Sequence, residues 1–399
     1  MKKGLFGLIF IILLSLLFTL ANTSFILADD EVREIEQNEE ELPVPIRAKI
    51  IKVISNDNEE TEYSGGTIET RSQLLEVKVL QGLHKGKIIK AHHYLNSFNE
   101  AYNILLTEGK EVFLYIEENE DGSIEKAFVA EIVRDRYLLY LTIIFILSIL
   151  IVGKLKGLKS LISLSITCAA VIYILLPMIL KGYDPVLVSV MVCVGIIIIT
   201  LIMVSGFNHK TLSAIVGTAG GVITAGVIAL IVGYLTNLTG LGDEESQMLM
   251  YIPQNIKFDF RGLLFSGIII GAMGAVMDVA VSIASAVNEV ALVNSDAKTR
   301  DLIKAGMNVG RDILGTMADT LILAYASASI PLMLLLMAYN VSFVEIINRE
   351  LIASEVVRAL SSSIGLVVTV PLTAVVAGTL VKRKKTGIKM KHNNVDFRY

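Results

Sequence analysis

Seven long apolar segments between residues 137 and 381 constrain this chain more than any other feature of its sequence. A helix of about 20 apolar residues is long enough to cross the hydrocarbon core of a bilayer. Because lipid offers no hydrogen-bond partners, chains cross it only as helices or closed barrels. The sequence therefore predicts an α-helical polytopic membrane bundle. The seven spans are expected at 137–153, 158–180, 185–206, 211–235, 262–293, 302–338 and 353–381.

Lysine and arginine gather in alternate loops, which predicts the orientation of the bundle. Cytoplasmic loops carry an excess of these residues. By that rule the cytoplasmic side holds the loops near residues 154–159, 210 and 298–304 together with the basic tail 382–399. The opposite loops carry few basic residues, and one contains the acidic run at 243–246. The C-terminus is therefore expected in the cytoplasm and the region before the first span outside it.

The chain begins with two lysines and an apolar stretch, which is the layout of a signal peptide or signal anchor over residues 1–28. Residues 29–42 are acidic and lack periodicity, as expected of a linker. Residues 43–136 then form an exported β domain, with the run "SNDNEE" among its turns. Its five short strands, which suggest a small OB-like barrel, are predicted at 46–55, 73–82, 86–95, 111–118 and 126–134.

Motifs for catalysis or cofactor binding are absent from the sequence, so no cofactor and no metal are expected. The two cysteines, Cys168 and Cys193, fall inside predicted spans, which disfavours disulfides and thiolate metal sites. His84, His92 and His93 are interpreted as exposed residues at strand edges. Acidic and basic residues alternate in the β domain, so no nucleic-acid partner is predicted. The expected partner is the lipid bilayer.

Spans four to six carry glycines four residues apart. Such pairs let helix backbones approach closely in a membrane, where the hydrophobic effect does not drive association. These spans are therefore expected to form the tight core of the bundle. The pairs are Gly217 with Gly221, Gly267 with Gly271, and Gly306 with Gly310.

Polar side chains form a stripe along each of the fifth and sixth spans. The fifth carries four within about 60° of one another on a helical wheel: Asp278, Ser282, Ser285 and Glu289. The sixth carries a second stripe, with an arginine at its border: Asn308, Asp312, Gly315, Asp319 and Arg311. Matching Asp278 with Asp319 brings the two stripes face to face, with the turn between residues 298 and 299.

Two carboxylates held together in a low dielectric do not both ionise cheaply, so they share a proton or bind a cation. Acids within membrane spans mark ion pathways. The stripes therefore favour an ion-linked secondary transporter that carries protons or Na⁺ between spans five and six. The rival interpretation is a structural zipper in which polar groups only join the two helices. In the last span, Glu355 and Arg358 are expected to form an interfacial ion pair.

Two further functions stay open. Paired aspartates on adjacent spans are the arrangement of intramembrane aspartyl hydrolases, although here "TMA" precedes Asp319 and Met277 precedes Asp278, unlike the motifs of those enzymes. The transporter interpretation predicts no enzymatic activity. Alternatively, the bundle is a non-transporting anchor or assembly factor whose exported β domain binds a partner.

Several segments resemble the YibE/F family of bacterial membrane proteins: "GLKSLISL", "GFNHKTLSAIVGTAGGV", "RGLLFSGIIIGAMGAVMDVAVSIASA" and "GMNVGRDILGTMADTLILAYAS". The resemblance extends from the β domain to the last span, and it is most specific around Asp278 and Asp312. It implies the same organisation and a location in the bacterial plasma membrane. It implies no mechanism, because no activity of the family is established.

Overall fold

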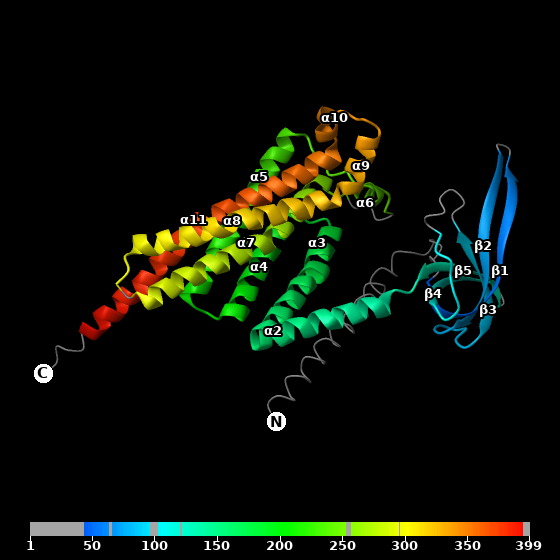
Figure 1. Cartoon of the computed structure of the whole chain (residues 1–399), viewed down its shortest axis with the longest axis horizontal. Helices are drawn as coiled ribbons and strands as arrows, with labels where there is room; N and C mark the ends of the chain where they lie inside the picture. The colour runs from blue at the N-terminus through cyan, green and yellow to red at the C-terminus, as the bar shows by residue number, and fades with distance from the viewer. Residues whose placement is uncertain are drawn as a thin grey trace, which may run out of the picture. The chain divides into compact units, whose positions relative to one another are not determined.

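A computed structural model of the chain describes residues 44–63, 66–95, 103–119, 122–252, 257–294 and 296–393. It divides the chain into a unit that ends at Ile143 and a unit that begins at Ile144 (Figure 1). The predicted signal segment 1–28 and acidic linker 29–42 lie outside the described residues.

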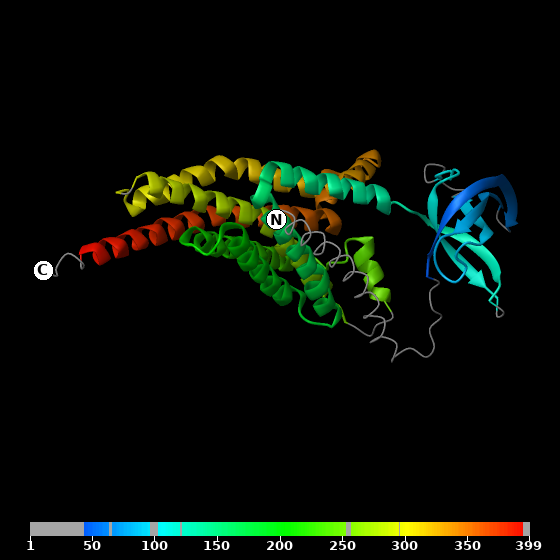
Figure 2. The same ribbon diagram turned by 90° about the horizontal axis from the view of Figure 1, so that it is seen from below.

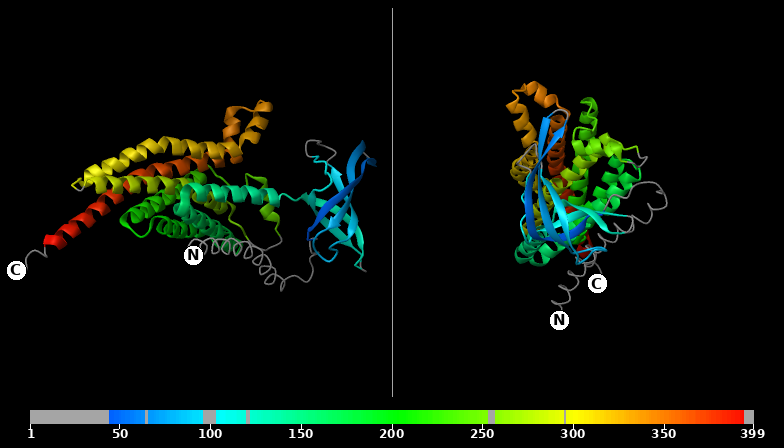
Figure 3. Two further views of the ribbon diagram at one scale, coloured as in Figure 1. Left: turned by 60° about the horizontal axis from the view of Figure 1, so that its bottom comes forward. Right: turned by 90° about the vertical axis from the view of Figure 1, so that its right-hand side faces the viewer.

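The first unit contains a closed five-stranded barrel, which confirms the predicted small β-barrel (Figure 3). The strands run in the order β1-β2-β3-β5-β4, and all pairs are antiparallel except β3 with β5. Alternate side chains such as Leu75, Val77 and Leu114 fill the interior because successive residues of a strand point to opposite faces. The strands are β1 (Ile46–Tyr63), β2 (Gly66–Val79), β3 (Ile88–Leu95), β4 (Glu111–Glu118) and β5 (Ile124–Ile132).

Two details of the barrel differ from the sequence-based expectation. The run "SNDNEE", predicted as a turn, belongs to β1, whose pairing with β2 continues to Tyr63 opposite Gly66. Polar residues are compatible with a strand as well as a turn when the backbone ladder continues. His84 is buried, not an exposed edge residue, and its Nε2 lies 2.7 Å from Glu118 Oε1.

The second unit is helical, and the predicted count of seven spans is not confirmed. Among the described residues, five helical segments are long and apolar enough to cross a membrane, and a sixth is obtained if α8 and α9 form one broken span. The helices are α2 (Asp135–Ala170), η2 (Val171–Leu175), α3 (Leu176–Leu180), α4 (Pro185–Ser205), α5 (His209–Leu235), α6 (Glu244–Met248), η3 (Leu249–Tyr251), α7 (Phe260–Val293), α8 (Thr299–Ala328), α9 (Ile330–Ala338), α10 (Phe343–Asn348) and α11 (Glu350–Asn393).

The lower count arises because the 46 residues of α2, η2 and α3 are continuous, although they contain two helices that meet at a kink, where two spans were predicted. The predicted boundary coincides with an interruption at Lys154, whose φ of 48° is non-helical. The predicted span 302–338 is broken near Pro331, where α8 and α9 meet at 58°. A proline lacks an N–H and starts a helix more readily than it continues one.

Side-chain caps fix where three of the long helices begin. Asp184, Asn208 and Asp259 each accept a hydrogen bond from a backbone N–H in the first turn of α4, α5 and α7, respectively. Such caps satisfy backbone donors that a helix leaves free at its start. Predicted and observed starts therefore agree within about two residues for α4, α5 and α7.

Helices α5, α7, α8 and α11 pack side by side around the main core, as the views in Figures 1 and 2 show. A Cβ on Gly217 would meet Thr373, and one on Gly221 would meet Thr369, so the glycine edge of α5 lies against α11. The core therefore includes the last span as well as the predicted spans four to six. Helix α11 also continues to Asn393, into the predicted tail 382–399.

Candidate functional site

The polar residues of α7 lie on one face of the helix, away from the core. Asp278, Ser282 and Glu289 are exposed and Ser285 is half-buried. The opposite face, which includes Val276 and Val287, is fully buried. The helix period thus separates a packed face from an ionisable face on the same membrane helix.

Helix α8 has the same arrangement. Its buried face contains Gly306, Gly310 and Leu321. Its outward face carries the predicted stripe, all of it exposed: Asn308, Arg311, Asp312, Gly315 and Asp319. In addition, α8 reaches the hydropathy of a membrane span only together with α9.

The two helices are antiparallel neighbours, but they meet through other residues than predicted. A Cβ on Gly306 would lie 2.7 Å from Val287 Cγ2, and one on Gly310 would lie 3.1 Å from Ile283 Cδ1. The predicted register placed Val287 level with Gly310, so the observed one is shifted by about one helical turn at this end. Glycines allow the closest approach, and the contact forms along the glycine edge of α8 rather than along its polar face.

The two stripes therefore do not face each other. Among the described residues, none of the eight polar side chains of the two stripes joins another through a hydrogen bond or ion pair, and Arg311 is not paired with Glu289. The geometry excludes the predicted path enclosed between spans five and six of one chain. It leaves two ionisable faces on adjacent helices, both directed outward.

A small polar cavity of about 190 Å³ lies where α7, α11 and the segment before α7 meet. Its lining includes Asp243, Glu350 and Arg358, together with Gly267 from the polar face of α7. Sequence reasoning missed this cavity because its residues come from three distant segments. The expected ion pair of Glu355 with Arg358 is confirmed at 3.5 Å.

Tyr325 of α8 connects the cavity with the polar face of α7. Its ring lies 5.9 Å from the Arg358 guanidinium carbon, and its hydroxyl would be 2.6 Å from a Cβ on Gly271. Gly271 therefore leaves room for the hydroxyl, whereas a Cβ on Gly267 would meet nothing within 4 Å in the part of the chain that the structure describes. The face that carries Asp278 thus continues through Gly271 to a polar cavity at one end of the helix.

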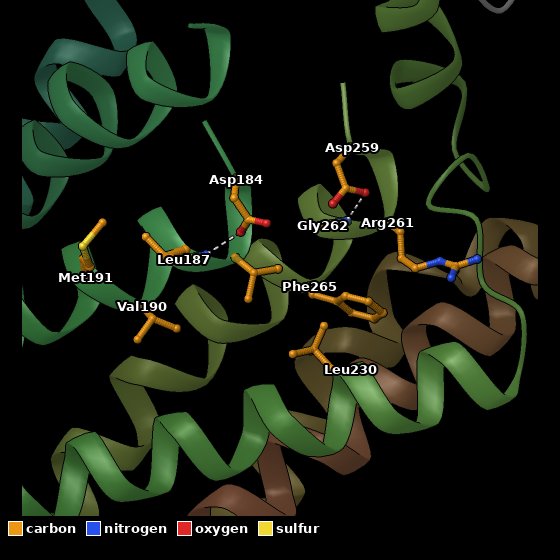
Figure 4. A pocket seen from close by; sticks show the side chains of 10 residues that line it. Asp184, Leu187, Val190, Met191, Leu230, Asp259, Arg261, Gly262 and Phe265 are labelled. Carbon is orange, nitrogen blue, oxygen red and sulfur yellow. Dashed lines mark hydrogen bonds between the residues drawn. The ribbon is translucent and has the colours of Figure 1, made fainter. Parts of the chain in front are cut away.

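A larger cavity of about 600 Å³ lies between α4, α5 and α7 (Figure 4). Asp184 and Asp259 cap helices at its rim, and Arg261 extends away from them to donate to the Leu238 carbonyl oxygen at 2.7 Å. The remaining lining is apolar, including Val190 and Phe265. Because these polar groups already have partners, the cavity suits an apolar chain better than an ion.

Comparison with known families identifies the chain. A family model for YibE/F-like protein matches residues 141–383, and one for the YibE/F family N-terminal domain matches residues 45–131. The chain belongs to the YibE/F family. Neither a curated protein nor a solved structure matches it.

The two matched regions of this YibE/F protein correspond to its two kinds of structure. The N-terminal match covers the barrel strands, and the longer match covers the helices from within α2 to within α11. Family membership and the apolar helices together identify a membrane protein. The polar faces of α7 and α8 lie within the longer match.

Proposed function

We propose that this YibE/F protein is an ion-linked secondary transporter in which protons or Na⁺ move along the polar faces of α7 and α8. The observation that carries the proposal is the exposure of Asp278, Asp312 and Asp319 on two adjacent membrane helices. An ionised side chain at membrane depth costs at least about 3 kcal/mol, so such residues are retained where they line an ion route.

The rival roles of the two faces have less support. A zipper within one chain requires contacts between the stripes, and none of the described residues supplies one. An aspartyl hydrolase requires two carboxylates on one water, whereas α7 and α8 direct their aspartates outward from a contact made by Gly306 and Gly310. The proposal therefore includes no enzymatic step.

The proposed location is the bacterial plasma membrane, with the barrel outside the cytoplasm and the C-terminus inside it. The support is the excess of basic residues in alternate connections between helices. Lys210 in the first turn of α5 and Arg300 with Lys304 at the start of α8 are examples. The proposed partners are the lipid bilayer and the transported ion.

Flux measurements on the full chain in proteoliposomes test the transporter. Under an imposed pH or Na⁺ gradient, Asp278→Asn and Asp319→Asn are expected to lower ion flux by about tenfold or more, because an amide neither carries the proton nor binds the cation with its charge. Glu245→Gln, an exposed acid on α6, is the control and should leave flux unchanged. Wild-type flux equal to that of empty liposomes under both gradients, or unaltered flux in both variants, rejects the proposal.

A second candidate function, partner binding by the barrel, is favoured by an aromatic cluster. The ring of Tyr94 lies 5.9 Å from that of Phe128 and 6.1 Å from that of His92, and Tyr94 is 55% exposed. Exposed rings bind the flat faces of sugars and apolar side chains.

Co-sedimentation of the full chain with isolated cell-wall glycan tests this candidate. Binding is expected to be lost in Tyr94→Ala and retained in Ile88→Ala, because Ile88 is an exposed residue of the same strand outside the ring cluster. Equal sedimentation of both variants would remove the aromatic cluster as a binding site.

A further inference from the structure

The outward faces of α7 and α8 carry glycines that packing among the described residues does not require. A Cβ on Gly267, Gly274 or Gly315 would meet no atom of the described residues within 4 Å, whereas Cβ atoms on Gly306 and Gly310 would collide with neighbours. Glycine within a helix is about 1 kcal/mol less favourable than alanine, so an unneeded glycine calls for an explanation. Close approach by a protein surface outside the chain provides one.

An open glycine alone does not define an interface, since Gly195 on α4 is open as well. The α7 and α8 faces differ from that of α4 because they also hold ionisable groups. Lipid cannot solvate the charges of Arg311, Asp312 and Asp319, which are all exposed in the single chain. A protein that covers these charges must therefore supply polar or opposite charges of its own.

The α8 face is complementary to itself. Arg311 and Asp312 are successive residues, about 100° apart around the helix and about 1.5 Å apart along it. Asn308 and Gly315 lie between them on the helical wheel. Two copies inserted with the same orientation and related by a two-fold axis along the membrane normal bring their α8 helices together in parallel. Arg311 of each copy then faces Asp312 of the other, which forms two equivalent ion pairs.

The spacing along α8 also fits a parallel pair. Asn308, Gly315 and Ile322 recur every seven residues, the period of a seam between two supercoiled helices, and Ile322 is 40% exposed. A polar residue such as asparagine within such a seam favours one register and one oligomeric state. The glycine in the middle lets the two backbones approach.

We propose that a second copy of this chain packs on the α8 face centred on Asn308 and Gly315 and closes the polar route beside it. This inference rests on the proposed function, because the space that the second copy encloses is the proposed ion route. The route then has protein on all sides. The transporter is accordingly a homodimer in which each copy completes the site of the other.

Cysteine cross-linking of the full chain in native membranes tests the dimer. In a Cys168→Ser, Cys193→Ala background, Gly315→Cys and Asn308→Cys are expected to form disulfide-linked dimers on mild oxidation. The matched control is Ile199→Cys, which lies on α4 and is 49% exposed, and it should remain monomeric. Two seam positions are used so that the loss of packing at one of them does not decide the result.

A charge exchange tests the proposed pairing. Arg311→Asp in the Gly315→Cys chain is expected to lose the dimer band because it places four acids together, and Arg311→Asp with Asp312→Arg should restore it. Cross-linking of both seam variants no stronger than that of Ile199→Cys, together with the mass of one chain per nanodisc, would overturn the dimer. Cross-linking requires no flux, so dimers without flux reject only the transporter, and flux from single chains rejects only the dimer.

Discussion

Gly221→Val is expected to destabilise the helical unit by about 3 kcal/mol, the upper part of the range for overpacked interiors. A Cβ at this position would meet Thr369 Oγ1, would lie 2.8 Å from Val276 Cγ1, and would lie 2.9 Å from the Gly365 carbonyl oxygen. Two of these atoms belong to α11 and one belongs to α7. A shift of α5 that relieves the contact with one of these helices therefore disturbs its packing against the other. Backbone atoms at such distances do not move as a flexible side chain does.

The measurement is the midpoint of heat-induced loss of the monodisperse full chain in detergent. Gly195→Val is the matched control, since a Cβ there meets none of the described residues within 4 Å and the same substitution occurs in a membrane helix. Gly221→Ala should give a smaller loss, which Thr369→Ala should partly restore by removing the nearest hydroxyl. Equal midpoints for the two valine variants would show that the α5–α11 contact is not close-packed.

The barrel was predictable because its signals are local. Segments such as 111–118 are short runs of β-branched, aromatic and other apolar residues flanked by polar ones, and β4 occupies that range. The full length of the β1–β2 hairpin was not predictable, because pairing beyond residue 55 depends on the partner strand and not on the polar residues of "SNDNEE". Local composition does not reveal whether a neighbouring strand continues.

The helical spans were predictable for the same reason, but the backbone conformation at the connection between the first two was not. Apolar length located α4, α5 and α7, and the end of the first predicted span at residue 153 coincides with the interruption at Lys154, which Gly153 directly precedes. A positive φ at lysine depends on how the flanking helices pack. Gly157, whose Cβ would meet the Ile149 carbonyl oxygen, allows that close approach.

The candidate site shows which part of helix geometry a sequence contains. Periodicity correctly grouped Asp278 with Glu289, and Asn308 with Asp319, because residues on one face recur every 3.6 positions. Periodicity did not show whether each polar face is directed toward the neighbouring helix or outward. The assumed turn between 298 and 299 was also late, since α7 ends at Val293 and α8 begins at Thr299. A turn centred earlier shifts the register toward the observed contact of Val287 with Gly306.

The second large loss of stability is expected at a buried side-chain amide in the barrel. The pattern of residues in the sequence did not predict this buried amide. Gln73 on β2 is 2% exposed. Its Oε1 accepts a hydrogen bond from Leu106 N at 2.8 Å, and its Nε2 donates to Leu106 O at 3.4 Å and to Asn56 Oδ1 at 3.0 Å. The amide group of Gln73 thus pairs with both backbone polar groups of Leu106, as a neighbouring strand would. The side chain of Leu106 lies in the barrel core.

Gln73→Leu is expected to destabilise the barrel by about 3 kcal/mol, because it leaves the Leu106 N–H and C=O buried without partners while keeping the volume of the side chain. Hydrogen exchange on the full chain measures the effect at the Leu106 amide, which should exchange about a hundredfold faster. The control is Gln81→Leu, the same substitution at an exposed turn position, where exchange at Leu106 should not change. Gln73→Asn, one methylene shorter, should resemble Gln73→Leu if reach to Leu106 is what matters. Unaltered exchange in Gln73→Leu would show that the amide pairs of Gln73 do not hold the segment around Leu106 against the barrel.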